Sequence, residues 1–145
     1  MIKHDEIGPE KIIEVHDAKS GMHGFLVIVN TNLGPGKGGF RMTSSVSREE
    51  VARLARAMTL KTAMAELPFG GAKGGIVANS KELTKEKKKE IVEAYAIALK
   101  NVCPSLYVSA PDMNIGEEEM KWFADANGDL KSCTGKPKEL GGIPH

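Results

Sequence analysis

Several features that define whole classes of proteins are missing from this sequence of 145 residues. Its 20 lysine and arginine residues nearly balance 19 acidic residues, so the formal net charge is only +1. Such a balance argues against a dominant electrostatic partner such as duplex DNA or an anionic membrane. We therefore expect no nucleic-acid partner, and any functional use of charge must be local.

Residues that bind metals or form disulfide frameworks are also few. Cys103 and Cys133 are the only cysteines, and neither has a cysteine or histidine nearby at the spacing of a zinc site. The four histidines are scattered along the chain, so we expect no bound metal. No segment approaches the roughly 18 apolar residues of a membrane span, and the polar N-terminus has no signal-peptide core. These absences predict a cytoplasmic protein with reduced cysteines and no membrane partner.

The residues that are present, 41% hydrophobic and 27% charged, are typical of a globular domain. Apolar patterning predicts strands that alternate with helices, and this alternation indicates an α/β fold whose sheet is largely parallel after its opening strands. The first helix begins at Ser47, because Ser47 and Glu50 have the spacing of a capping box. The other helices are predicted at about 84–102 and near 117, and the strands at 12–15, 25–29, 76–78 and 106–108.

Two glycine-rich segments each carry a lysine, Lys37 within 36–39 and Lys73 within 70–75. We interpret both as turns in which a ligand can approach the backbone closely, although tight turns with solvated lysines have the same composition. Neither segment matches a nucleotide motif. A P-loop needs Ser or Thr after the lysine, and the dinucleotide fingerprint opens a helix, whereas 70–75 follows one.

Lys61 and Asp112 are further candidates for a site. Lys61 lies at the edge of the apolar stripe of the first helix, and Asp112 follows the last predicted strand. A surface lysine with a packed stem and a turn aspartate are the structural alternatives. If Lys37, Lys61 and Lys73 converge, their mutual repulsion would favour a carboxylate substrate and a lysine that exchanges protons.

Four ordered motifs resemble the glutamate/leucine/phenylalanine/valine dehydrogenase family over about residues 10–145. They are Gly34–Met42, Met58–Thr62, Leu67–Gly75, and Ala110–Asp112 followed by Gly116–Met120. The resemblance implies a three-layer α/β/α domain with a mixed sheet. It also implies reversible oxidative deamination of an L-amino acid to a 2-oxo acid and ammonia, with NAD or NADP as cofactor.

The same resemblance implies roles for individual residues. Lys73 and Asp112 would be catalytic, the lysine polarising the 2-oxo group and the aspartate carrying protons to and from the substrate nitrogen. Lys61 would hold the α-carboxylate. Lys37 would bind a side-chain carboxylate, which favours glutamate and 2-oxoglutarate. The glycines expected to line the substrate are Gly38, Gly39, Gly70 and Gly71.

Some features keep alternatives open. Arg41-Met42 is more similar to the leucine branch, and Met113-Asn114-Ile115 replaces a glycine-containing segment. A branched-chain substrate, or a non-catalytic module that binds an amino acid and oligomerises, therefore remain as alternatives. Family members continue into a dinucleotide-binding domain that would bind most of the cofactor. We thus expect residues 1–145 to be a substrate-binding and oligomerisation domain, inactive alone and part of a homo-oligomer, a hexamer in the full enzyme.

Overall fold

Strands and helices alternate along the chain as the apolar pattern predicts. The computed structural model describes residues 2–138. Its strands are β1 (Lys11–Asp17), β2 (Met22–Asn30), β3 (Gly36–Thr43), β4 (Gly70–Val77) and β5 (Tyr107–Ala110). Its helices are α1 (Arg48–Met64), α2 (Lys85–Ala98) and α3 (Glu117–Asn127), with short 3-10 turns at Ser80–Glu82 and Leu130–Ser132.

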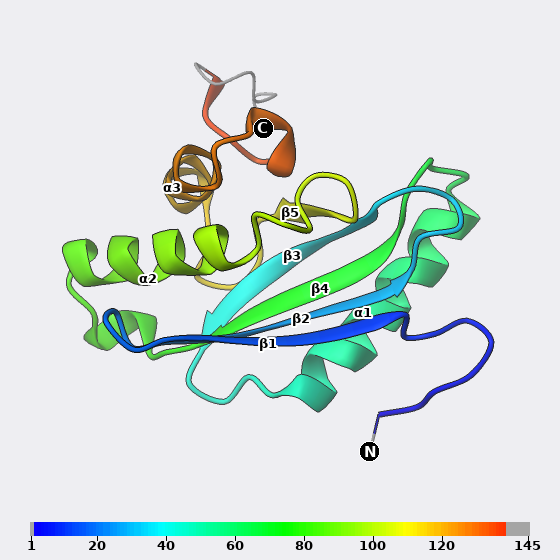
Figure 1. Ribbon diagram of the computed structural model, residues 1–145, viewed down its shortest axis with the longest axis horizontal. Coiled ribbons are helices and arrows are strands. Elements are labelled where there is room, and N and C mark those ends of the chain that lie inside the picture. Colours follow the sequence, from blue (N-terminus) through cyan, green and yellow to red (C-terminus); the bar gives the residue numbers. More distant parts are fainter. Residues whose placement is uncertain (1, 139–145) are drawn as a thin grey trace.

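The strands form one mixed sheet in the order β1-β2-β4-β3-β5 (Figure 1). β1 pairs with β2, and β2 with β4, in antiparallel fashion. β3 is parallel to both β4 and β5. The predicted α/β class and mixed sheet are therefore confirmed, with the parallel pairs confined to the strands after the opening hairpin.

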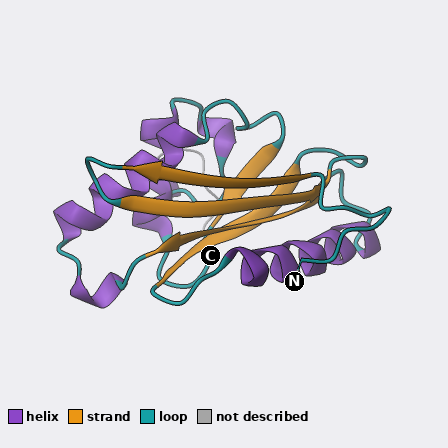
Figure 2. Cartoon of the chain, turned by 60° about the horizontal axis from the view of Figure 1, so that its bottom comes forward, coloured by secondary structure: helices purple, strands orange, loops and turns teal. Residues whose placement is uncertain are grey.

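Helices cover both faces of this sheet. α1 packs on β2 and β4 from one side, whereas α2 contacts β2 from the other side and packs against α3 (Figure 2). Each interlayer space has its own apolar core. One core is centred on Val27, Val51 and Ala55, and the larger one includes Phe40, Tyr95 and Phe123. The domain thus has the three layers that the family resemblance implies.

Ser47 caps α1 as predicted, because its Oγ accepts a hydrogen bond from the backbone N–H of Glu50 at 3.2 Å. α2 is shorter than predicted and ends at Ala98 rather than near 102.

No helix among residues 2–138 combines the length and apolar character needed to cross a membrane.

The prediction that both glycine-rich segments are turns is wrong, because 36–39 opens β3 and 70–75 forms most of β4. Packing explains why glycines occupy these strands. A side chain at Gly71 would overlap Thr59 of α1, and one at Gly74 would overlap the hydroxyl of Tyr95 of α2. Helices therefore approach the central strand closely from both sides, which only a residue without a Cβ allows.

Candidate functional site

Both motif lysines lie on the face of the sheet that α1 covers. Lys37 of β3 is in register with Gly71 of β4, and Lys73 is the next residue of β4 on the same face. Thr59 of α1 packs directly over Gly71, which identifies the side of the sheet. The site therefore lies on a sheet face, and not beyond the strand ends where the turn interpretation placed these lysines.

Lys73 forms an ion pair with Asp112, the residue that the sequence pattern also singled out. Lys73 Nζ lies 3.0 Å from Asp112 Oδ2, and the exposed fractions of the two side chains are 12% and 16%. Arg41 Nε donates a hydrogen bond of 2.9 Å to the same oxygen. A carboxylate bound by two cations in a partly dehydrated setting is held in one orientation.

Gly39 makes this contact across strands possible. It pairs with Ala110 at the end of β5, and the chain then carries Asp112 over β3. A Cβ at Gly39 would lie 3.0 Å from the Asp112 Cβ and would overlap the carbonyl oxygen of Pro111. The glycine therefore leaves the space through which Asp112 reaches Lys73.

Two opposing effects set the charge of Asp112. Burial disfavours its ionised form, whereas the hydrogen bonds from Lys73 and Arg41 favour it, and together they hold the pKa of Asp112 below its ordinary value of 3.8. Asp112 is therefore a carboxylate at neutral pH and can accept a proton.

The turn after Asp112, which contains no glycine at positions 113–115, is well defined. Asn114 adopts a left-handed backbone with φ of 63°, a conformation that asparagine tolerates better than most residues. Its side-chain amide donates to the carbonyl of Met42 at 2.8 Å, and its own carbonyl accepts from Lys88 Nζ at 2.7 Å. These bonds anchor the turn to β3 and α2 and hold Asn114 in its left-handed conformation.

Lys37 has a different environment from Lys73. Its ammonium lies 5.0 Å from the centroid of the Phe69 ring, a cation–π contact. Among residues 2–138 it forms no ion pair or side-chain hydrogen bond. The side chain is half-buried, so this cation is free to pair with an anionic ligand.

Lys61 lies in the last turn of α1 and is exposed. It lies two residues after Thr59, the residue that contacts Gly71. The structure thus brings Lys73, Asp112 and Gly39 together directly. Lys61 makes no ion pair with them in the described part of the chain.

Gly38 and Gly70 are buried. Because successive residues of a strand face opposite sides of the sheet, they face away from the side that carries Lys37 and Gly71. A Cβ on Gly38 would overlap the carbonyl oxygen of Ala72, and one on Gly70 that of Asn30. Their contribution to a ligand on the lysine face is therefore limited to backbone groups. Gly39 and Gly71 face that side of the sheet, but Pro111 and Asp112 fill the space over Gly39 and Thr59 fills the space over Gly71.

Arg41 is the site residue that sequence reasoning missed. Besides its contact with Asp112, the guanidinium forms an ion pair with Glu50 of α1, in which Arg41 Nη1 lies 4.0 Å from Glu50 Oε2. The Arg41 side chain is only 16% exposed. The signal was present in the alternation Lys37, Gly39, Arg41, which places all three on one face of a strand. Interpreting this segment as a turn concealed the alternation.

A three-layer α/β/α domain with a lysine–aspartate pair on a cationic, glycine-lined sheet face is typical of the substrate-binding part of amino-acid dehydrogenases. The chain belongs to the Glu/Leu/Phe/Val dehydrogenase family, because the model of that family's dimerisation domain matches residues 9–128.

Individual relatives agree with this assignment. The chain is 43% identical to glutamate dehydrogenase A2 of Halobacterium salinarum over 116 residues, covering 75% of this chain and 28% of the relative. It is 36% identical over 149 residues to the NADP-specific glutamate dehydrogenase of Saccharolobus shibatae, covering 93% and 35%. The hetero-hexameric glutamate dehydrogenase of Thermus thermophilus, in its Leu-bound form, superposes with a TM-score of 0.86 at 32% identity, covering 93% and 36%. The chain thus spans about a third of the length of these proteins.

Proposed function

We propose that this chain is the substrate-binding part of a glutamate dehydrogenase, which interconverts L-glutamate with 2-oxoglutarate and ammonia. The observation that supports this most directly is the ion pair of Lys73 and Asp112, whose charged atoms are 3.0 Å apart. Lys37 lies on the same sheet face and pairs with no carboxylate among residues 2–138. The pair supplies proton transfer and the second lysine supplies a charge for a dicarboxylate.

Lys73 and Asp112 have complementary roles in this proposal. The Lys73 ammonium donates a hydrogen bond to the 2-oxo oxygen and so polarises the carbonyl toward attack by ammonia. Asp112 accepts a proton from the substrate ammonium during deamination and returns it to the nitrogen during amination. Its depressed pKa keeps it ionised and ready to accept. Arg41 shares Oδ2 with Lys73 and orients the carboxylate without contacting substrate.

The remaining lysines would bind the two carboxylates of the substrate. Lys61 would hold the α-carboxylate and Lys37 the distal one. A leucine-type substrate would leave the half-buried Lys37 ammonium unpaired, which is unfavourable. This argument favours glutamate over a branched-chain amino acid. Gly38 and Gly70 would contribute peptide groups at most.

NAD or NADP would accept the hydride, because the relatives include both NADP-specific and NAD-specific glutamate dehydrogenases. The residues of this chain do not fit the pyrophosphate of a dinucleotide. The glycine segment 70–75 lies within β4 and not at the N-terminus of a helix, where phosphates bind. We therefore infer that the cofactor binds mainly to a separate domain of the full enzyme and that this chain alone is inactive.

We also propose that the enzyme is a homo-oligomer, a hexamer in its full form, and cytoplasmic. The matched family model is that of a dimerisation domain, and the Thermus relative is described as hetero-hexameric. Cys103 and Cys133 are both buried and unpaired, which is the usual state of cysteine in a reducing compartment.

Isothermal titration of this chain with 2-oxoglutarate and with 2-oxoisocaproate tests the proposal. We expect preferential binding of 2-oxoglutarate, weakened at least about tenfold by Lys37→Leu because one charge-assisted contact is lost. Lys100→Leu, which removes an exposed lysine after α2, is the matched control and should change nothing.

Preference for the branched acid, or indifference to Lys37→Leu, would transfer the assignment to a branched-chain dehydrogenase. If neither acid binds the isolated chain, the same two variants are compared through KM in the full-length enzyme. A KM for 2-oxoglutarate unaffected by Lys37→Leu in that enzyme would contradict the proposed role of Lys37.

A further inference from the structure

A second cluster of functional groups lies at the β1–β2 hairpin, at the edge of the sheet that β1 forms. Glu14 and His16 are alternate residues of β1, and His23 is directly opposite His16 in the antiparallel ladder. The Glu14 Oε2 atom lies 2.6 Å from His23 Nε2 and 3.4 Å from His16 Nε2. The two imidazole rings stack with centroids 4.2 Å apart.

These three side chains are a set that a divalent transition-metal ion prefers. Two neutral imidazoles and one carboxylate form the protein part of many zinc sites, in which water completes the coordination. At Zn–ligand distances of about 2.0–2.1 Å, ligand atoms of a tetrahedral site are separated by roughly 3.4 Å. One ligand atom from each side chain, a ring nitrogen of each histidine and a carboxylate oxygen of Glu14, already lies within 4.8 Å of the other two. Side-chain rotations alone can therefore close the site.

The backbone supports the cluster without needing to move. The ladder fixes the pairs His16–His23 and Glu14–Phe25, and the His23 ring also packs at 4.8 Å from the ring of Phe25. The Glu14 carboxylate already contacts both imidazole rings, so its oxygens and the ring nitrogens converge on one place. His16 and Glu14 are exposed, which gives water access to the open coordination positions.

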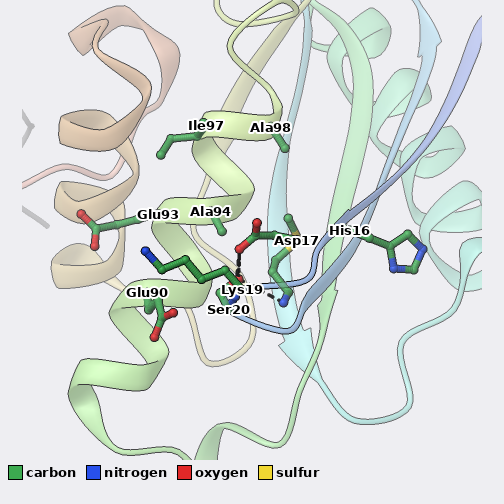
Figure 3. A pocket seen from close by; sticks show the side chains of 10 residues that line it. His16, Asp17, Lys19, Ser20, Glu90, Glu93, Ala94, Ile97 and Ala98 are labelled. Atoms are coloured by element: carbon green, nitrogen blue, oxygen red, sulfur yellow. Dashed lines mark hydrogen bonds between the residues drawn. The ribbon is translucent and has the colours of Figure 1, made fainter.

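A cavity beside this hairpin also has His16 among its lining residues. It lies between the β1–β2 turn and α2, where Asp17, Lys19 and Glu90 line it. Figure 3 shows the His16 ring directed away from these residues. The imidazole is therefore available on the other face of the hairpin, next to Glu14 and His23.

We propose that Glu14, His16 and His23 form a binding site for one divalent transition-metal ion of the Zn²⁺ type. Bound metal would link the edge strand β1 to β2 through side chains as well as through the ladder. This inference does not depend on the proposed dehydrogenase activity. Histidine spacing in the sequence gave no sign of the site, because only the hairpin register brings His16 and His23 together.

Titration of the whole chain with ZnSO₄ at pH 7.5, by calorimetry and by equilibrium dialysis, tests the proposal. We expect one Zn²⁺ ion per chain with a Kd in the low micromolar range. His16→Ala and His23→Ala should each weaken binding at least about tenfold, since each removes one of the three protein ligands. Zinc at saturating concentration should also raise the Tm of the unchanged chain by several degrees, and not that of His16→Ala.

His4→Ala and His145→Ala remove the other two histidines and serve as controls that should leave the affinity unchanged. Circular dichroism of every variant confirms that it is folded, which is expected because His16 is exposed on a strand. The proposal is wrong if the chain binds no zinc below about 100 μM. It is also wrong if His4→Ala or His145→Ala abolishes binding while His16→Ala and His23→Ala retain it.

Discussion

Removal of Asp112 should destabilise this domain more than removal of Lys73, although the two side chains form one ion pair. Asp112 is the carboxylate between two cations, since Lys73 Nζ and Arg41 Nε both contact its Oδ2. In Lys73→Met, Arg41 keeps its partner. In Asp112→Asn, the two cations keep their charges, lose the shared anion and repel each other.

The distances give the size of the effect. Two unit charges 3.0 Å apart attract by about 5.5 kcal/mol at an effective dielectric constant of 20. Desolvation offsets much of this attraction, because the Lys73 and Asp112 side chains are only 12% and 16% exposed. We expect Asp112→Asn to lower the free energy of unfolding by about 2–3 kcal/mol and Lys73→Met by less than about 1 kcal/mol. The coupling energy of the double-mutant cycle should be about 1–2 kcal/mol.

Urea unfolding at pH 7 gives the free energy of unfolding of the unchanged protein, the two single variants and the double variant. Trp122 is the only tryptophan and is 8% exposed, so its fluorescence reports unfolding. Lys100→Met provides a control for the loss of an exposed lysine and should stay within about 0.5 kcal/mol of the unchanged protein. Lys73→Met as destabilising as Asp112→Asn, or a coupling energy near zero, would refute the reasoning that Asp112 balances two cations.

Two further predictions concern the same contact. Because the pKa of folded Asp112 is below 3.8, its stabilising contribution is present at pH 7 and is lost as the pH falls through the folded pKa. The difference in urea midpoint between the unchanged protein and Asp112→Asn should therefore shrink below about pH 3.8. Gly39→Ala should lower the free energy of unfolding by about 1–3 kcal/mol, because the added Cβ meets Asp112 and Pro111. In thermal melts Gly116→Ala, whose Cβ meets nothing within 4 Å, should lose at most about 1 kcal/mol through poorer capping of α3.

Local patterns predicted the features of the fold that depend on local physics. Ser47 was identified as a cap from its spacing to Glu50, and the structure confirms the hydrogen bond. The glycine-rich strands could not be predicted in this way, because glycine is disfavoured in strands when considered alone. Glycine occupies this strand because Thr59 and Tyr95, which come from other parts of the sequence, pack directly on the backbone of β4.

The same distinction applies to the candidate site. Lys73 and Asp112 were identified from motifs, and their ion pair depends on β5 lying next to β3. Arg41 needed only the correct assignment of its segment as a strand. No pattern within the sequence relates His16 to His23, because the register of the hairpin decides that they face each other.

The four glycines of β4 limit how this domain can diverge. A packed core usually adapts through paired substitutions, in which one residue becomes larger while its neighbour becomes smaller. The glycines at 70, 71, 74 and 75 have no side chain that could become smaller. Several of them also lie against backbone atoms, which a substitution cannot remove. Few neighbouring positions can therefore compensate for a larger residue in β4. Under the proposed function, we therefore expect changes in substrate preference to arise outside β4, at positions such as Lys37 and Phe69.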